Sequence, residues 1–160
     1  MTKSQSAQTP QQQPMPSPEL KRLDILVGTW STQGKVEANP TDPGVKIIGT
    51  DTYEWQHGGF FLIHRVDVRI GDEKIEAIEI IGGYDASSQT YPMRSFDSQG
   101  NFVTMEASVN DDGLWTFTGE SARATLAVSD DGNTLTAKWE RLTDGSKWLP
   151  WMDLKLTMAR

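Results

Sequence analysis

Short runs of alternating hydrophobic and polar residues fill most of the chain, from Trp30 to the C-terminal end. β-Branched and aromatic residues are common in these runs, and turn-forming pairs such as Gly58-Gly59 and Gly71-Asp72 separate them. This pattern is typical of antiparallel strands joined by tight turns. Further turns are expected at Asn39-Pro40, Ala86-Ser87-Ser88, Gln99-Gly100, Asp111-Asp112-Gly113, Asp130-Asp131-Gly132 and Asp144-Gly145. The runs predict an all-β, antiparallel up-and-down β-barrel of about ten strands, and parallel βαβ units are disfavoured because no helix-length segment separates the strands.

The N-terminal part of the chain has a different pattern. Residues 1–17 are rich in Gln, Ser, Thr and Pro, so we expect a disordered tail there, followed by one domain over residues 18–160. Ser17-Pro18-Glu19 has the residue types of a helix N-terminus. Apolar residues follow at helical spacing, namely Leu20, Leu23, Leu26 and Val27, and Gly28 stands where a C-cap glycine belongs. We therefore expect a short amphipathic helix from Ser17 to Gly28 that closes one end of the barrel.

The turn at Gly58-Gly59 sets the register of the first predicted hairpin, because both glycines can adopt positive φ. Centring the turn there pairs Trp55 with Leu62 and Tyr53 with His64. Loops at 71–74, 86–89 and 99–100 then extend the register to later strands. The extended register pairs Val66 with Glu79, His64 with Ile81, Ile81 with Arg94, Glu79 with Phe96, and Arg94 with Met105.

Directly paired residues share a face of a sheet, so this register predicts which side chains point into the barrel. The mostly apolar face is the expected interior, and it contains Tyr53, Trp55, Leu62, His64, Val66, Val68, Ile70, Ile75, Ala77, Glu79, Ile81, Arg94, Phe96 and Met105. The other face is mostly polar, with a few apolar exceptions: Phe61, Ile63, Ile78 and Ile80. A shift of one residue at any turn would exchange the two faces from that turn onward.

Composition and charge exclude several classes of function. The 160 residues carry a formal net charge of −7 and include no cysteine, so disulfides and thiolate chemistry are excluded. An acidic chain repels phosphate backbones, and we expect no nucleic-acid partner. We also expect no membrane partner, since no apolar run approaches the roughly 20 residues of a spanning helix. The N-terminal residues do not resemble a secretory signal, so the expected location is the cytoplasm.

Four polar side chains are expected inside the barrel: Tyr53, His64, Glu79 and Arg94. Buried charges are costly unless they are paired or hydrated, so these residues either form a satisfied network or line a wet cavity. His64 could be a general base, a ligand contact or simply a satisfied buried histidine. Arg94 could clamp a carboxylate or phosphate, or pair internally with Glu79. The expected cavity residues are Tyr53, Trp55, His64, Glu79, Arg94 and Met105.

Metal and cofactor sites are not expected. Asp111-Asp112-Gly113 and Asp130-Asp131-Gly132 lack the alternating oxygen ligands and closing Glu of an EF-hand, and Asp-Gly is an ordinary turn. No serine stands beside a histidine in the pattern of a nucleophile and its base. We therefore predict no catalytic residues, no metal and no cofactor.

The motif Gly28-Thr29-Trp30, after a short helix and at the start of the first strand, resembles the lipocalin and calycin signature. The wider sequence resembles a bacterial family of unknown function in the same group, through 26–30, 58–62, 83–85, 91–97 and 148–153. This resemblance implies a barrel with a helix at its base and a Trp beneath it. Nitrobindins are similar in shape and bind haem through a His near the chain end. This chain has only His57 and His64, so haem bound in that way is not expected.

Three functions are compatible with these observations. The first is a non-enzymatic barrel that binds a small, partly apolar molecule with a polar or anionic group near Arg94 and His64. The second is a small enzyme that uses His64 and Glu79 as an acid–base pair. The third is a structural or dimerisation module that uses the apolar residues of the outer face, and the protein is then a monomer or a homodimer.

Overall fold

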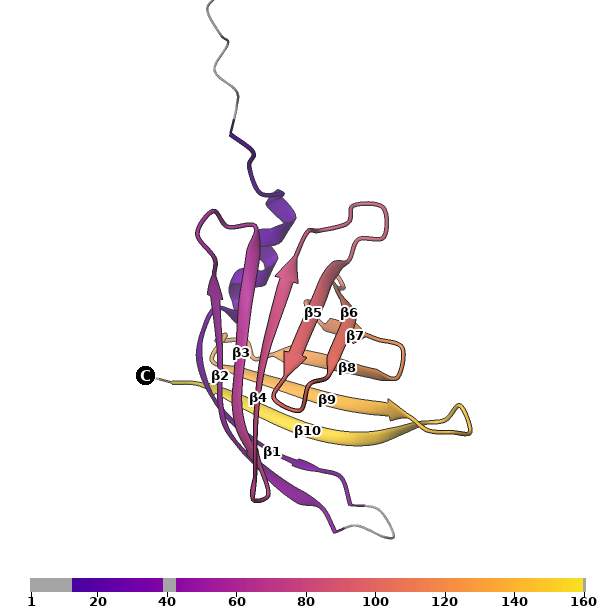
Figure 1. Cartoon of the computed structure of the whole chain (residues 1–160). Helices are drawn as coiled ribbons and strands as arrows, with labels where there is room; N and C mark the ends of the chain where they lie inside the picture. The colour runs from indigo at the N-terminus through magenta and orange to yellow at the C-terminus, as the bar shows by residue number, and fades with distance from the viewer. Residues whose placement is uncertain (1–12, 39–42, 160) are drawn as a thin grey trace, which may run out of the picture.

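The computed structural model describes residues 13–38 and 43–159, and it shows an antiparallel barrel closed by the pairing of β1 with both β2 and β10 (Figure 1). Each strand otherwise pairs with its neighbours in sequence. The predicted up-and-down barrel of about ten strands is confirmed. The ten strands are β1 (Gly28–Val36), β2 (Val45–Trp55), β3 (Phe61–Ile70), β4 (Glu73–Gly82), β5 (Tyr91–Asp97), β6 (Phe102–Val109), β7 (Trp115–Thr118), β8 (Ala122–Val128), β9 (Thr134–Leu142) and β10 (Trp148–Met158).

Much of the expected tail at 1–17 and the expected turn at Asn39-Pro40 lie outside the described residues. In the part of the chain that the structure describes, no helix is long and apolar enough to cross a membrane.

The helix before the barrel is a 3₁₀-helix, η1 (Pro18–Leu26), and it lies across one end of the barrel (Figure 1). Its buried residues are Leu20, Leu23 and Leu26, whose spacing of three aligns them along one side of a helix with three residues per turn. The predicted C-cap is wrong, since Val27 is extended and Gly28 already begins β1. Ser17 does not cap the helix with its side chain, which instead donates to the carboxylate of Glu19.

Trp30 connects η1 to the barrel. Its side chain is fully buried, and its indole Nε1–H donates to the carbonyl oxygen of Leu26 at 2.8 Å. Indole N–H groups need an acceptor when they are buried, and the last turn of η1 supplies one. Trp30 and the three leucines of η1 belong to one core cluster with side chains from most of the strands. The helix is therefore held as part of the core.

The register of the first predicted hairpin is confirmed: Tyr53 pairs with His64 and Trp55 with Leu62. The register between β3 and β4 differs from the expected one by two residues. Ile70 pairs with Glu73 across the short turn at Gly71-Asp72, so that His64 pairs with Glu79 and Leu62 with Ile81. Because a shift of two preserves the face of every side chain, the interior residues of β3 and β4 are those expected.

The predicted interior position of Arg94 is wrong. Asp85 bridges Thr90, as a loop at 86–89 requires, but further along Ile81 pairs with Met93 rather than with Arg94. The segment from Ile81 to Asp85 therefore contains one more residue than the segment from Thr90 to Met93, with which it pairs. The extra residue lies near Gly83, whose φ of +78° is readily adopted only by glycine. This single-residue irregularity exchanges the faces of β5.

The same irregularity moves Phe96 to the outer face, where it is 49% exposed and stacks on Phe102. The next turn restores the expected inward and outward positions from β6 onward. Asp97 N–H bonds to the carbonyl of Asn101, which makes a three-residue turn rather than the predicted two-residue one. Met105 consequently pairs with Met93 and is buried, as expected, although the expectation reached it through two errors that cancel.

The two ends of the barrel differ in packing. The core lies beside η1, where Trp30, Leu62 and Ile81 are almost completely buried. Toward the opposite end, some inward-facing side chains are less covered: Val66 and Ala77 are half-buried, and Val103 is 45% exposed although it shares a face with buried Met105. Val68 and Ile47, at the same end, remain buried. Solvent therefore reaches the inner wall of the barrel at the end away from the helix.

Candidate functional site in the barrel interior

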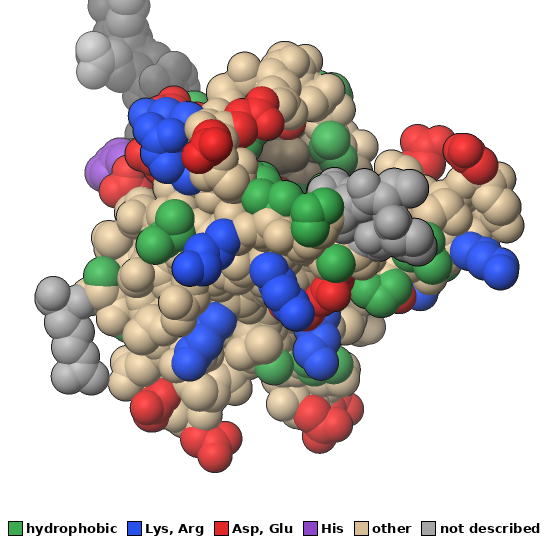
Figure 2. Space-filling model, turned by 90° about the horizontal axis from the view of Figure 1, so that it is seen from below, with side chains coloured by type: hydrophobic (Ala, Val, Ile, Leu, Met, Phe, Trp, Pro, Cys, Tyr) green, Lys and Arg blue, Asp and Glu red, His purple; other side chains and the backbone are tan. Residues whose placement is uncertain are grey.

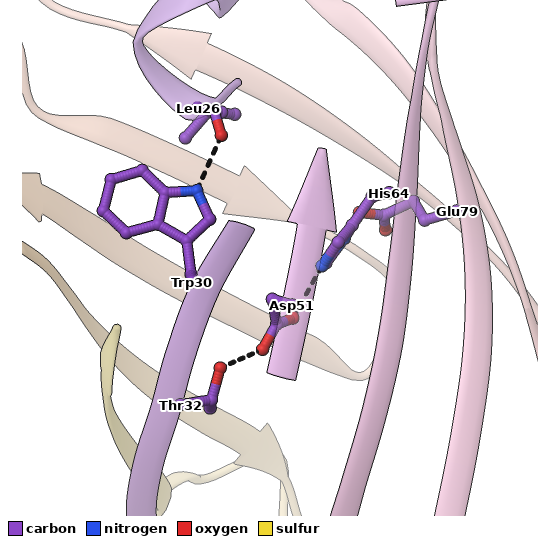
Figure 3. Close-up of polar contacts among 6 residues, drawn as sticks. All are labelled: Leu26, Trp30, Thr32, Asp51, His64 and Glu79. Atoms are coloured by element: carbon purple, nitrogen blue, oxygen red, sulfur yellow. Dashed lines mark hydrogen bonds and ion pairs between the residues drawn. The ribbon is translucent and has the colours of Figure 1, made fainter. Parts of the chain in front are cut away.

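Three neighbouring strands bring a histidine and two carboxylates together inside the barrel (Figure 3). His64 of β3 pairs directly with Glu79 of β4 and with Tyr53 of β2. Asp51 precedes Tyr53 by two residues on β2, and since side chains alternate along a strand it points to the same face. The direct pairing of β2, β3 and β4 therefore places all four side chains on the inner wall.

Both ring nitrogens of His64 are engaged by carboxylates. Nε2 lies 2.7 Å from Oδ1 of Asp51, and Nδ1 lies 3.0 Å from Oε1 of Glu79. The second oxygen of Asp51 accepts a hydrogen bond from the hydroxyl of Thr32 on β1. The ring of Tyr53 stacks on the imidazole, with 3.9 Å between centroids and 8° between planes. The histidine is thus held in position on three sides.

The electrostatics of this cluster favour a protonated imidazole. Burial alone lowers the pKa of His64, but the hydrogen bonds and negative charges of Asp51 and Glu79 outweigh it and raise the pKa to about 9. At neutral pH both ring nitrogens then carry protons, and each donates to a carboxylate. Burial, with the nearby carboxylates of Asp51 and Glu79, also raises the pKa of Tyr53 well above its usual value. Tyr53 therefore stays a neutral phenol.

These features decide what the cluster can do chemically. A protonated imidazole beside two carboxylates carries a net charge of about −1, so the cluster attracts hydrogen-bond donors and cations and repels anions. An imidazolium with both N–H groups donated cannot accept a proton at neutral pH, which disfavours His64 as a general base. The side chains of His64, Asp51 and Glu79 are 12%, 9% and 14% exposed, so the cluster is enclosed without being sealed.

The other expected cavity residues lie elsewhere. Trp55 is at the η1 end of β2, where its indole N–H donates to Oδ1 of Asp24 at 2.7 Å. Met105 is part of the packed core. Arg94 is exposed on the outer face, opposite Ile80 and Thr104. Of the six residues, the structure brings together only Tyr53, His64 and Glu79.

Asp51 and Thr32 are the site residues that sequence reasoning missed. Asp51 and Thr32 are both buried. The alternation that places Tyr53 inside also places Asp51 inside two residues earlier, and Thr32 follows buried Trp30 by two residues. The alternation of inward and outward side chains therefore indicates both residues: Asp51 on the strand that leads into the first predicted hairpin, and Thr32 on the strand before it. Among the described residues, no group of three or more His, Cys, Asp or Glu side chains has an arrangement suited to a metal ion.

The outer face of β3 to β6 is unusually apolar. Phe61 and Ile78 are 39% and 42% exposed, and η1, which packs at the end of the barrel, leaves them uncovered. Because Phe96 faces outward, it and Phe102 extend this surface, which we call the outer apolar face: Phe61, Ile63, Ile78, Ile80, Phe96 and Phe102. The one-residue shift in β5 therefore enlarges the surface that the sequence predicted.

Comparison with known proteins gives a family and a fold. A family model described as "Protein of unknown function (DUF1579)" matches residues 15–157. Among solved structures, the crystal structure of Rv2717c from M. tuberculosis is similar, with a TM-score of 0.70 and 13% sequence identity over 91% of this chain and 99% of that chain. At this identity the similarity concerns the fold alone. No curated protein matches the sequence.

Proposed function

The chain belongs to the DUF1579 family of proteins of unknown function, and we propose from its own residues that the barrel binds a small, partly apolar molecule with a hydrogen-bond donor or a cationic group. The observation that carries this proposal is the Asp51–His64–Glu79 cluster on an inner wall that solvent reaches. A calycin relationship is part of the proposal, and the position of Trp30 beneath η1 supports it.

The polarity of the expected ligand changes with the position of Arg94. An interior arginine would have favoured an anionic group, but Arg94 is outside and the interior cluster is net negative. Beyond the cluster, toward the end away from η1, the inner wall is apolar, with half-buried Val66 and Ala77 among its side chains. A ligand that enters there would place its apolar body against these residues. Its donor would lie at the second carboxylate oxygen of Glu79, because Oε1 is already engaged by His64.

We expect N-phenyl-1-naphthylamine, a neutral aromatic probe with one N–H donor, to bind inside the barrel with increased fluorescence. The Glu79→Gln variant should bind the probe about tenfold more weakly, because exchange of a charged acceptor for a neutral amide oxygen removes about 1.5 kcal/mol of hydrogen bonding. Fluorescence titration measures both affinities, with far-ultraviolet circular dichroism to confirm that the variant is folded.

The Arg94→Ala variant is the matched control, because it changes one charge on the same sheet but on the outer face. Its affinity for the probe should equal that of the wild type. Equal weakening by both variants, or a wild-type barrel that leaves the probe fluorescence unchanged, would contradict the proposal.

A second function, self-association, is favoured by the outer apolar face. Phe96 and Phe102 stack on each other with centroids 5.0 Å apart, yet both are about half exposed. Exposed charges of both signs border the surface: Glu54 and Arg65 lie along β2 and β3, Glu76 lies on β4, and Arg94 lies on β5. A two-fold axis brings a surface against its own copy, and a mixed border then allows opposite charges to meet.

We expect the wild-type protein to sediment as a dimer at micromolar concentration, and the Phe96→Glu variant to sediment as a monomer. A carboxylate at the centre of an apolar contact would be buried without a partner, which is strongly unfavourable. Leu149→Glu changes an equally exposed apolar residue elsewhere and serves as the control. A monomeric wild type in analytical ultracentrifugation would exclude this function and leave the interior site untouched.

A further inference from the structure

A second concave site lies on the outer wall of the barrel, away from the Asp51–His64–Glu79 cluster. It is a groove of about 550 Å³ across β1, β2, β9 and β10, and Gly34 of β1 is one of its lining residues. Gly34 allows the close approach of the strands here, because a Cβ atom at this position would lie 2.1 Å from the carbonyl oxygen of Asp153. We call this site the basic groove; its lining residues with side chains on the outer face include Lys35, Lys46, Ile48, Asp153 and Lys155.

Positive charge is concentrated around the basic groove although the chain as a whole carries −7. Lys35, Lys46 and Lys155 line it, and two more cations stand beside it in the sheet register, since Arg69 pairs with Ile48 and Lys138 with Asp153. Among the described residues, Asp153 is the one carboxylate that lines the groove, and the Nζ of Lys35 lies 3.9 Å from Glu37 beyond its edge. Figure 2 shows Lys and Arg side chains spread over the face seen from below.

The groove also exposes apolar surface. Ile48 is 60% exposed in its lining, and the aliphatic stems of the surrounding lysines can lie along it while their ammonium groups stay in water. An exposed isoleucine within a ring of lysines offers two contacts at once: an apolar surface and a cationic border. A binding site with these two properties matches a molecule that has the complementary pair, an apolar body and an anionic group.

We propose that the basic groove binds a small amphipathic anion, a free carboxylate with an alkyl chain. The carboxylate lies among Lys35, Lys46 and Lys155, and the chain lies on Ile48. The volume is within the range of small-molecule pockets, roughly 300–1,000 Å³, and the concave shape suits a free molecule better than the flat surface of a membrane. The charge of this groove is opposite to that of the interior cluster, so the two sites select different ligands.

A titration of the ¹⁵N-labelled protein with decanoate, below its micelle-forming concentration, tests this proposal. We expect amide shifts at residues 33–35, 46–48 and 153–155, and none at residues 64–66 or 77–79. Replacing Lys35, Lys46 and Lys155 together by Gln should weaken binding about tenfold, since each exposed charge pair contributes modestly. The Ile48→Ser variant should weaken it about tenfold through lost apolar contact. High salt should weaken it further in the wild type.

Three controls distinguish binding in the basic groove from non-specific association with the protein surface. A triple variant with Lys21→Gln, Arg94→Gln and Lys147→Gln has the same net charge on other faces and should bind decanoate as the wild type does. Decyltrimethylammonium, with the same chain and the opposite charge, should cause no shifts in the groove. Inorganic phosphate should cause only weak shifts, because it lacks the chain.

Several results would overturn the proposal. They are decanoate shifts centred on the interior residues, equal binding of decyltrimethylammonium in the groove, and no shifts with decanoate at all. Binding to vesicles of anionic phospholipid without binding of free decanoate would also overturn it, and would identify the face as a membrane-docking surface. The Glu79→Gln test of the interior site uses a different probe, so its result does not depend on any of these outcomes.

Discussion

Replacing Trp30 by alanine is expected to lower the free energy of unfolding by about 3–5 kcal/mol. The side chain is fully buried, so the truncation leaves a cavity between η1 and the strands. It also removes the indole donor from the carbonyl oxygen of Leu26, which adds the cost of an unsatisfied buried acceptor. For a chain of this size the midpoint temperature should fall by about 10 °C. Urea and thermal unfolding, followed by circular dichroism, measure both quantities.

Trp148 offers a matched control for this prediction, since it allows the same substitution at a half-buried site. Its ring lies 4.2 Å from the guanidinium carbon of Arg123, a contact near the surface. The Trp148→Ala variant should lose only about 1 kcal/mol. A Trp30→Phe variant, which keeps most of the volume, should fall between the two. Similar losses for Trp30→Ala and Trp148→Ala would show that η1 is not held by Trp30 in the way described.

The second large effect is a loss of stability at alkaline pH that depends on His64. The folded protein raises the pKa of His64 from 6.5 to about 9, because the hydrogen bonds and charges of Asp51 and Glu79 outweigh the opposing effect of burial. Between these two values the folded state keeps a proton that the unfolded chain has lost. Stability from this group is therefore complete below about pH 6.5 and disappears as the pH rises through about 9.

The size of the effect follows from the shift in pKa. One pKa unit corresponds to about 1.4 kcal/mol, so the contribution of His64 is about 3 kcal/mol for the folded-state pKa of about 9. The free energy of unfolding of the wild type should fall by most of this amount between pH 7 and pH 9.5. The His64→Gln variant should be less stable at pH 7 and should show a much flatter pH profile over the same range. Urea titrations at each pH measure the difference.

A direct measurement keeps this prediction testable if His64→Gln fails to fold. The chain has two histidines, and nuclear magnetic resonance resolves their imidazole signals in the wild type. The His57→Gln variant, altered at an exposed position in the β2–β3 turn, assigns the remaining signal to His64. A titration midpoint for His64 near or below its ordinary value of 6.5 would contradict the two carboxylate contacts as described.

The arrangement of the interior cluster favours a binding role over acid–base catalysis. A general base near neutral pH needs a free lone pair and a pKa close to the working pH. His64 has neither, because both ring nitrogens point at carboxylates and its pKa is raised. The same contacts hold the ring rigidly, with Tyr53 stacked on one side. A rigid group with a net negative charge is suited to recognition of a donor.

Local patterns are sufficient to predict much of the fold and part of the site. The alternation of apolar and polar residues predicts the barrel, and the glycines at 58 and 59 predict the pairing of Tyr53 with His64, which the structure confirms. The leucines of 20–26 predict the helix at the barrel end, and their spacing of three matches the 3₁₀ form that the structure shows. In each case the information lies within about ten residues of chain.

The sequence by itself therefore determined the class of fold, the short helix before the first strand, and the inward position of His64 and Glu79, while its resemblance to the calycin signature implied the place of Trp30 beneath that helix. Only the tertiary structure decided the face of Arg94. One extra residue near Gly83 exchanges the inward and outward faces of the whole of β5, and the loop at 86–89 alone does not predict that residue. The tertiary structure also decided the basic groove, whose lysines at 35, 46 and 155 are far apart in the chain. These lysines meet because closure of the barrel places β1 between β2 and β10, and charge that is dispersed along the chain thereby becomes concentrated on one face.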